Sequence, residues 1–276
     1  REVVVGSLDP NPLNRGKGVR FLRKHGIRVT VGVLESKVRE QNEGFFKHMT
    51  AKRPFVTLKM AQTLDGKIAT RTGLSRWVPS PASRKFVHEL RAKHDAVLVG
   101  KNTFLKDDPL LAAPQGSRAA LAGRPWKIVM TSASKWSSRA RTLKDERLTI
   151  AVFPEKELGL MVKKTETQQG SLLLLPVREK HGRIDVVHLL ERLALLGINN
   201  LLVEGGGELA WSFLEAGCVD RAYWVVAPKV FGGRTAKTSV EGDGVKSPDQ
   251  AFPFKISKAK RSGEDWIFEG VFITGK

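Results

Sequence analysis

The stretch LLVEGGGELA, residues 201–210, carries the residues with the clearest potential for chemistry. Three glycines, Gly205–Gly207, follow an apolar strand-like run and precede a helix start. Such a bend brings backbone N–H groups and the positive end of a helix dipole together, which suits an anionic phosphate. Gly205, Gly207 and Ala210 also match the spacing G-x-G-x-x-A. The dinucleotide fingerprint needs an acidic residue about 20 positions later, whereas the next strand ends in Pro228 and Lys229, so a standard Rossmann site is not expected.

Three charged residues are candidates for polar catalysis: Lys59, Asp65 and Glu204. Lys59 lies in the apolar stretch FVTLKMA and Glu204 ends an apolar strand, where a charge is costly unless it is paired or bound to a ligand. We expect Lys59 to bind substrate, with proton donation as the alternative. Asp65 precedes Gly66, so its alternative role is to form the turn. The alternative for Glu204 is a carboxylate stabilised by a helix dipole.

The elements that position these residues alternate between strand and helix after a break near residue 50, where TAKRP has no apolar periodicity. Ser80 and Pro81 predict a helix start, and Gly197 ends a helix whose apolar face begins at Val186. The pattern predicts a mostly parallel sheet covered on both faces, with an antiparallel pair near the C-terminus. Predicted strands cover 3–5, 27–34, 55–61, 95–100, 126–132, 148–153, 199–204, 222–230, 254–262 and 265–273.

Ligands of open parallel sheets bind at the carboxyl ends of the strands. This rule directs attention to four segments that follow predicted buried strands: 59–61, 100–108, 131–132 and 204–208. We expect these segments to meet at one rim.

Composition excludes several classes of protein. The 276 residues carry a formal net charge of +19 and a single cysteine, Cys218, which excludes an internal disulfide and a cysteine-rich zinc site. We find no signal-peptide pattern and no run of eighteen apolar residues, so a cytoplasmic protein that does not bind membranes is expected. The charge predicts attraction to polyanions or phosphorylated small molecules. Nucleic-acid binding has little other support because no recognition motif is found.

Two long segments carry a specific resemblance. K-x-A-x-T-L-D-G at 59–66, S-x-W at 75–77, LR at 90–91 and G-x-x-T-x-x-x-D-D-P-x-L at 100–111 are followed by LLVEGGGELAWSFLEAGCVD. Together they resemble the reductase domain of the bifunctional riboflavin-biosynthesis deaminase/reductase family, RibD. The resemblance implies a dihydrofolate-reductase-like fold over residues 51–276: a mixed, mainly parallel sheet flanked by helices.

Residues 1–50 are similar to the C-terminal end of the family's zinc-dependent deaminase domain. That domain needs an H-x-E segment and a P-C-x-x-C segment to hold zinc and move protons. Neither segment occurs here. We therefore expect residues 1–50 to be a remnant that binds no catalytic metal, and we expect no deaminase activity from this chain.

The resemblance implies that NADPH reduces 5-amino-6-(5-phosphoribosylamino)uracil to its ribitylamino product, and that the enzyme is a homodimer. Implied substrate contacts are Ser75, Arg91, Leu111 and Glu204. Implied cofactor contacts are Ala61, Trp77, Thr103, Asp107, Ser132, Lys135, Gly206, Gly207, Glu208, Leu209, Ala210, Trp211 and Ser212. Ser132 and Lys135 fall where the family binds the 2′-phosphate, and the fork of Arg91 suits the substrate phosphate.

One departure concerns the substrate. Pro114 occupies a position where the family usually has an arginine that helps to hold the phosphate, and Arg118 comes later. A reductase of another pteridine-like or nucleoside-like substrate therefore stays as an alternative, and a basic nucleic-acid-binding domain is a weaker one.

Overall fold

The computed structural model describes residues 1–75, 78–166 and 171–273, and it divides into two compact units. The first unit comprises Arg1–Phe55 with Leu190–Asn199, and the second comprises Val56–Leu189 with Asn200–Lys276. No helix in the described ranges is long and apolar enough to cross a membrane.

The first unit contains a small parallel sheet and short helices. Strand β1 (Glu2–Val5) pairs in parallel with β2 (Arg28–Val31), and helix α1 (Lys17–Lys24) connects them. Helices α2 (Glu35–Gln41) and α3 (Glu43–Ala51) follow. The sequence predicts one helix here, but Asn42 leaves the helical conformation and its side-chain amide donates to the carbonyl of Val38 at 2.8 Å. Asparagine competes with the helical backbone in this way, which explains the break.

The second unit is built on a large sheet, in which nine strands are found among the described residues. Their order across the sheet is β12-β13-β11-β3-β10-β4-β5-β6-β7. The strands are β3 (Phe55–Thr63), β4 (Ala96–Val99), β5 (Trp126–Met130), β6 (Thr149–Pro154), β7 (Leu172–Val177), β10 (Asn200–Glu204), β11 (Arg221–Ala227), β12 (Phe254–Ser262) and β13 (Asp265–Phe272). β10, β4, β5, β6 and β7 form parallel pairs, and β12 and β13 are antiparallel, so the predicted mainly parallel sheet with an antiparallel end is confirmed.

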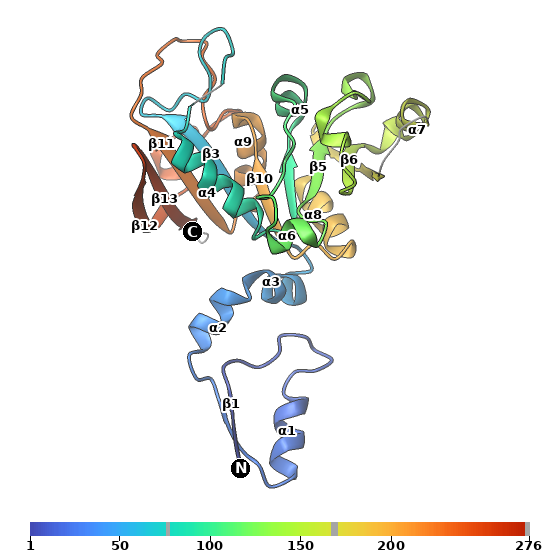
Figure 1. Ribbon diagram of the computed structural model, residues 1–276, viewed down its shortest axis with the longest axis vertical. Helices are drawn as coiled ribbons and strands as arrows, with labels where there is room; N and C mark the ends of the chain where they lie inside the picture. The colour runs from blue at the N-terminus through green and yellow to red at the C-terminus, as the bar shows by residue number, and fades with distance from the viewer. Residues whose placement is uncertain (76–77, 167–170, 274–276) are drawn as a thin grey trace. The chain divides into compact units, whose positions relative to one another are not determined.

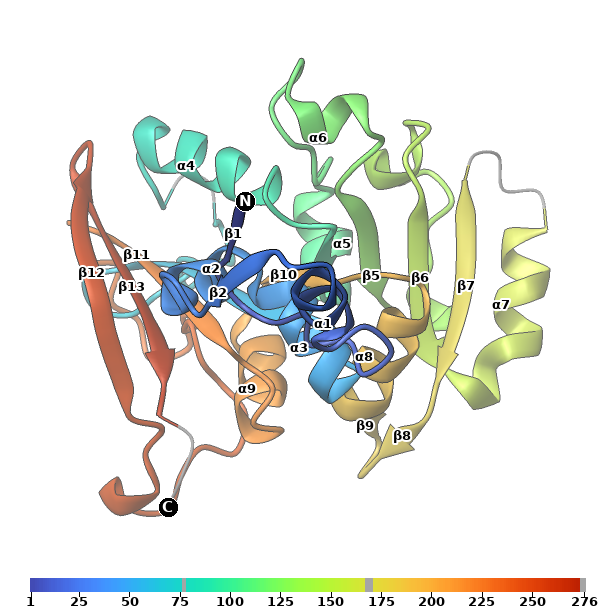
Figure 2. The same ribbon diagram turned by 90° about the horizontal axis from the view of Figure 1, so that it is seen from below.

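Helices cover the two faces of this sheet. α4 (Pro81–Arg91) and α5 (Lys101–Asp107) lie on one face, whereas α9 (Gly207–Glu215) and the start of α8 (Val186–Leu195) lie on the other (Figure 2). Two successive residues of β11 show the separation: the ring of Tyr223 packs on Phe86 of α4, whereas Trp224 faces α9. The remaining described helices and strands are α6 (Arg118–Leu121), α7 (Leu158–Thr165), β8 (Glu179–Lys180) and β9 (Arg183–Ile184).

The core consists of the apolar strands that the sequence predicts. All four residues of β4 and all six of β6 are buried, as expected for strands covered on both faces. β7 is not among the predicted strands, and Pro176 within it is unfavourable in a central strand. The structure places β7 at an edge of the sheet, where a proline is tolerated.

The start of α4 is fixed by the β12–β13 hairpin. The side chain of Ser80 accepts a hydrogen bond from the Ser83 N–H at 3.3 Å, and Pro81 is the first helical residue, as predicted. The buried carboxylate of Asp265 accepts a second bond from the Ser80 N–H at 2.7 Å, and the Ser80 and Ser83 hydroxyls donate to the carbonyl of Ser262. The position of α4 therefore depends on residues about 180 positions later in the chain.

We expect Asp265→Ala to lower the free energy of unfolding by about 2 kcal/mol, because the partly buried Ser80 N–H would lose its acceptor. Denaturant unfolding followed by circular dichroism measures this change. Asp249 is exposed, so Asp249→Ala is the control and should change stability by less than about 0.5 kcal/mol. Equal effects of the two variants would contradict a structural role for Asp265.

Candidate active site

Three charged side chains from three elements meet on the α4 side of the sheet. Arg91 donates from Nε to Oε1 of Glu204 at 2.8 Å and from Nη2 to Oε2 at 3.0 Å. Lys59 Nζ lies 4.0 Å from Oε2 of the same carboxylate. The side chains of Lys59, Arg91 and Glu204 are only 12%, 14% and 10% exposed. We call these three residues the charge cluster.

Each member of the charge cluster is placed by its element. Lys59 pairs with Tyr223 across β3 and β11 and so projects from the face on which α4 packs. Glu204 ends β10, the strand between β3 and β4, and Arg91 is the last residue of α4 (Figure 1). The three segments are far apart in sequence, and the strand order brings them together.

The charges of the cluster stabilise one another. Burial alone would raise the pKa of Glu204, but the charges of Arg91 and Lys59 and the hydrogen bonds from Arg91 outweigh it and lower this pKa from 4.5 to about 2. Burial lowers the pKa of Lys59, and Arg91 adds to this effect, while Glu204 opposes it. Burial would also lower the pKa of Arg91, but Glu204 reverses the direction. Glu204 is therefore an ionised hydrogen-bond acceptor.

The sequence predictions did not include His88, which lies one helical turn before Arg91. Its charge contributes to lowering the pKa of Glu204, and its Nδ1 lies 3.3 Å from the carbonyl oxygen of Ala112. The spacing of His88 and Arg91, three residues apart on one helix, was the available signal.

The expected cofactor residues follow the ends of neighbouring strands. Gly206 and the start of α9 follow β10, Thr103 and Asp107 follow β4, and Ser132 and Lys135 follow β5. Because these three strands are parallel and adjacent, the segments gather at one edge of the sheet, as the sequence predicts. Ala61 lies two residues after Lys59 on β3, and Trp77 lies outside the described residues.

Two residues of the expected site are hydrogen-bonded to each other. The hydroxyl of Ser75 donates to Oδ1 of Asp107 at 3.0 Å, so an implied substrate residue and an implied cofactor residue are adjacent. The hydroxyl of Ser132 lies 3.2 Å from that of Ser134, and Lys135 is exposed.

The glycine bend has one open position and one crowded position. A Cβ atom at Gly207 would lie 2.6 Å from the carbonyl oxygen of Thr238 and 2.8 Å from the backbone nitrogen of Glu241, so only glycine fits without a shift. A Cβ at Gly206 would meet no atom within 4 Å. Gly206 precedes α9 and has no side chain to cap it, which leaves space for an anion beside the first N–H groups of the helix.

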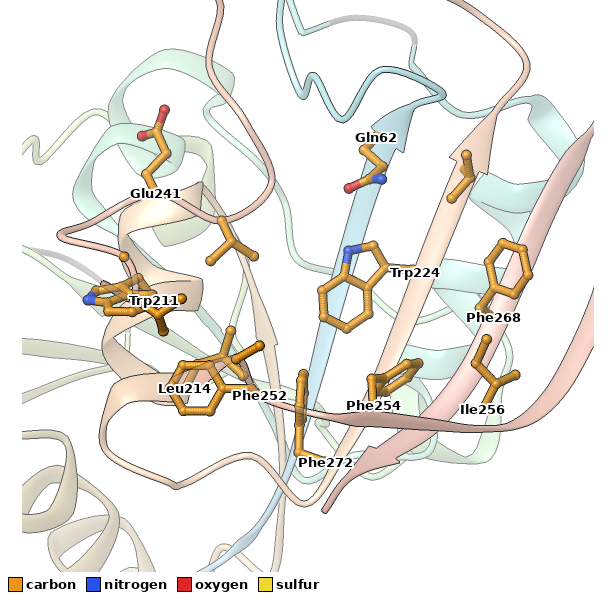
Figure 3. A pocket seen from close by; sticks show the side chains of 15 residues that line it. Gln62, Trp211, Leu214, Trp224, Glu241, Phe252, Phe254, Ile256, Phe268 and Phe272 are labelled. Carbon is orange, nitrogen blue, oxygen red and sulfur yellow. The ribbon is translucent and has the colours of Figure 1, made fainter. Parts of the chain in front are cut away.

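The expected residues within α9 point in different directions. Glu208 is exposed, whereas Leu209 and Ala210 are buried. The ring of Trp211 packs against Phe252 and lines an apolar groove of about 620 Å³ (Figure 3). Ser212 lines a separate cavity beside β8 and β9. The first turn of α9 is the part of this helix that follows Glu204 most closely in the sequence.

Asp65 lies in the turn after β3, where its carboxylate has three partners. It accepts from the Thr63 hydroxyl at 2.5 Å and from the backbone N–H groups of Phe231 at 3.2 Å and Gly232 at 2.7 Å. The Thr63 hydroxyl and these amides lower the pKa of Asp65 to about 2. The contacts fit the alternative of a turn-forming residue, and a catalytic role for Asp65 stays a prediction.

Metal ligands do not gather in the part of the chain that the structure describes: no three His, Cys, Asp or Glu residues there are placed to hold an ion.

The glycine bend provides a test of local packing. We expect Gly207→Ala to lower the unfolding midpoint, because its methyl group would force the 238–241 backbone away from α9. Gly206→Ala is the matched control, since its Cβ enters open space at a φ of −80°. An unchanged midpoint for both variants in thermal unfolding would show that the 238–241 segment does not restrict α9.

The depressed pKa of Glu204 predicts a pH-dependent stability difference. The stabilisation from ionised Glu204 is complete above pH 4.5 and is lost as the pH falls towards 2. We therefore expect Glu204→Gln to be less stable than the natural sequence by roughly 3 kcal/mol at pH 7, with the difference shrinking below pH 4.5. Denaturant midpoints of both proteins between pH 7 and pH 3 measure this, and a difference independent of pH would contradict an ionised Glu204.

Comparison with known proteins places the chain in a family. The model of the RibD C-terminal domain family matches residues 54–268. The riboflavin biosynthesis protein RibD of Aquifex aeolicus is 39% identical over 267 residues, which are 97% of this chain and 71% of the relative. A 2,5-diamino-6-ribosylamino-4(3H)-pyrimidinone 5′-phosphate reductase of Methanothermobacter thermautotrophicus is 37% identical over 217 residues, 79% of this chain and 97% of the relative.

A solved structure agrees with these matches. The diaminohydroxyphosphoribosylaminopyrimidine deaminase/5-amino-6-(5-phosphoribosylamino)uracil reductase of Thermotoga maritima superposes with a TM-score of 0.80 at 30% identity, over 99% of this chain and 72% of that one. The predicted resemblance and the dihydrofolate-reductase-like sheet are both confirmed, whereas the deaminase origin of residues 1–50 stays a prediction. The chain belongs to the RibD C-terminal domain family.

Proposed function

We propose that the protein is the NADPH-dependent reductase of riboflavin biosynthesis that converts 5-amino-6-(5-phosphoribosylamino)uracil into its ribitylamino product. The observation that carries the proposal is the buried charge cluster of Lys59, Arg91 and Glu204, which is formed by the central strands β3 and β10 and the last residue of α4. The relatives from Thermotoga and Methanothermobacter are named as reductases of pyrimidine ribosylamino phosphates, which supports this substrate class.

The reaction adds a hydride to the sugar C1 and a proton to a neighbouring heteroatom. Glu204 stays ionised, so it can accept hydrogen bonds from the pyrimidine or ribose but cannot donate the proton. Lys59 carries a proton on a buried ammonium whose pKa burial lowers, and it can therefore give up that proton more readily than an exposed lysine. We assign proton donation to Lys59, in addition to substrate binding.

Arg91 positions Glu204 in this scheme. Its Nε and Nη2 atoms are both engaged by the carboxylate, so the fork expected for the substrate phosphate is already used. The formal net charge of +19 still favours an anionic substrate. Direct contact between Arg91 and the phosphate stays a prediction.

The residues present fit a nicotinamide dinucleotide. The open space at Gly206 beside the start of α9 suits a diphosphate, and the exposed Lys135 with Ser132 suits the additional phosphate of NADPH. When bound, NADPH would supply the hydride. Thr103 and Asp107, at the end of the neighbouring strand β4, would complete its site.

A second substrate has specific support. The Methanothermobacter relative, which this chain covers almost completely, is named for the 2,5-diamino pyrimidinone, which differs from the uracil at the pyrimidine 2-position. Both compounds carry the same ribosylamino phosphate, and the charge cluster does not distinguish between them. Homodimeric assembly and a cytoplasmic location also stay predictions, and the mass of the protein in solution would decide the first.

The proposed reaction is tested by following NADPH oxidation with each pyrimidine supplied separately. We expect turnover with the uracil, and turnover confined to the 2,5-diamino compound would assign the second substrate. Glu204→Gln should lower kcat/KM at least about 100-fold, because it removes an ionised acceptor that holds the substrate and pairs with Lys59. NADPH binding should change less than about threefold, since the dinucleotide residues are separate.

The control is Glu215→Gln, which changes an exposed acid at the end of α9 and should keep normal kinetics. Near-normal turnover by Glu204→Gln would remove Glu204 from the site. NADPH binding without turnover of either pyrimidine would favour a reductase of another substrate.

A further inference from the structure

The loop from Asp108 to Leu111, which follows α5, has an unusual backbone. Asp108 has a φ of 41° and Leu111 a φ of 50°, both in the left-handed region that residues other than glycine seldom adopt. Such a conformation is strained and persists only where surrounding contacts impose it. Leu111 is also fully buried, although it lies in a loop.

The segment 141–147 supplies those contacts. The backbone N–H of Arg141 donates to Oδ1 of Asp108 at 2.7 Å, and the Thr142 hydroxyl donates to the Pro109 carbonyl at 2.8 Å. Arg147 donates from Nη2 to the carbonyl of Leu110 at 2.9 Å and from Nη1 to that of Leu111 at 3.0 Å. Four hydrogen bonds therefore fix four consecutive residues.

Arg147 is itself held by an ion-pair network that is anchored on a buried lysine. Its Nη2 lies 2.6 Å from Oδ2 of Asp145, and Oδ1 of Asp145 accepts from Lys127 Nζ at 2.7 Å. Lys127 projects from β5, is completely buried and also donates to the carbonyl of Thr142. A buried ammonium is costly unless its partners are fixed, so this network gives Arg147 little freedom to move. We call Lys127, Asp145 and Arg147 the loop brace.

The far end of the loop reaches His88, which lies on the same helix as Arg91. The carbonyl of Ala112, directly after Leu111, lies 3.3 Å from Nδ1 of His88, whose charge acts on Glu204. His88 is one turn from Arg91 on α4. The same loop begins beside Asp107, which binds Ser75. Residues 108–112 therefore connect the brace to His88 at one end and to Asp107 at the other.

We infer that Arg147, held by Asp145 and Lys127, is a positioning residue that fixes the 108–112 loop as a wall of the substrate site. The inference rests on the proposed function, because it identifies the ligand beside the loop as the phosphorylated pyrimidine. Arg147 acts through the carbonyls of Leu110 and Leu111 and does not contact the reacting atoms.

The main test is Arg147→Met, compared with Arg141→Met. Arg141 is exposed and contributes to the loop only through its backbone N–H, so its substitution is a matched control in the same segment. We expect Arg147→Met to raise KM for the pyrimidine about tenfold, while kcat changes less than about threefold and KM for NADPH less than about twofold. Arg141→Met should leave all three values unchanged.

Two further variants separate positioning from loss of folding. Arg147→Lys keeps the charge but lacks the fork that reaches two carbonyls, so it should restore only part of the affinity for the pyrimidine. Thr142→Val removes one neutral hydrogen bond and should raise the same KM by a smaller factor. If Arg147→Met does not fold, Thr142→Val and Arg147→Lys decide the question.

Hydrogen–deuterium exchange of the peptide covering 108–114 gives an answer independent of turnover. Faster exchange in Arg147→Met than in Arg141→Met is expected. Unchanged exchange, or a loss of kcat with KM unchanged, would overturn the inference. A natural enzyme that reduces neither pyrimidine would contradict the proposed function instead, and exchange would then still show whether Arg147 holds the loop.

Discussion

The carboxylate of Glu204 imposes the constraint on which the site depends. A buried negative charge at the end of a strand is stable only when cations meet it, and here Arg91 engages both of its oxygens while Lys59 lies 4.0 Å away. The strand order must therefore place β3 beside β10, and α4 must end directly above them. The contact between Asp265 and Ser80 fixes the opposite end of that helix, so the distant hairpin contributes to the alignment of Arg91.

Features specified by neighbouring residues could be predicted from the sequence. Ser80 and Pro81 mark the start of α4, and the unbroken apolar run of β4 identifies a strand covered on both faces. The break at Asn42 was missed because it depends on one side chain competing with its own helix. β7 is not among the predicted strands, and the edge position that makes Pro176 acceptable within it is not encoded locally.

The candidate site likewise contains features that the sequence indicates and features that depend on residues far away in the chain. The glycine bend can be recognised in the sequence as a short pattern, but the difference between an open Gly206 and a crowded Gly207 arises from residues 238–241. Arg91 was expected to bind a phosphate because of the resemblance and its forked side chain, and the sequence did not reveal that Glu204, 113 positions away, engages that fork. Arg147 was not identified from the sequence for a related reason. It donates hydrogen bonds to the backbone carbonyl groups of Leu110 and Leu111, which any residues at those positions would provide.

The outer edge of the large sheet has a consequence for assembly. β12 is the end strand, and nearly all of its side chains are exposed, including Lys255, Lys258 and Lys260. A strand from another molecule pairing there would bring these ammonium groups close to their counterparts in a protein that already carries a charge of +19. The row of lysines thus protects an exposed backbone ladder from edge-to-edge aggregation.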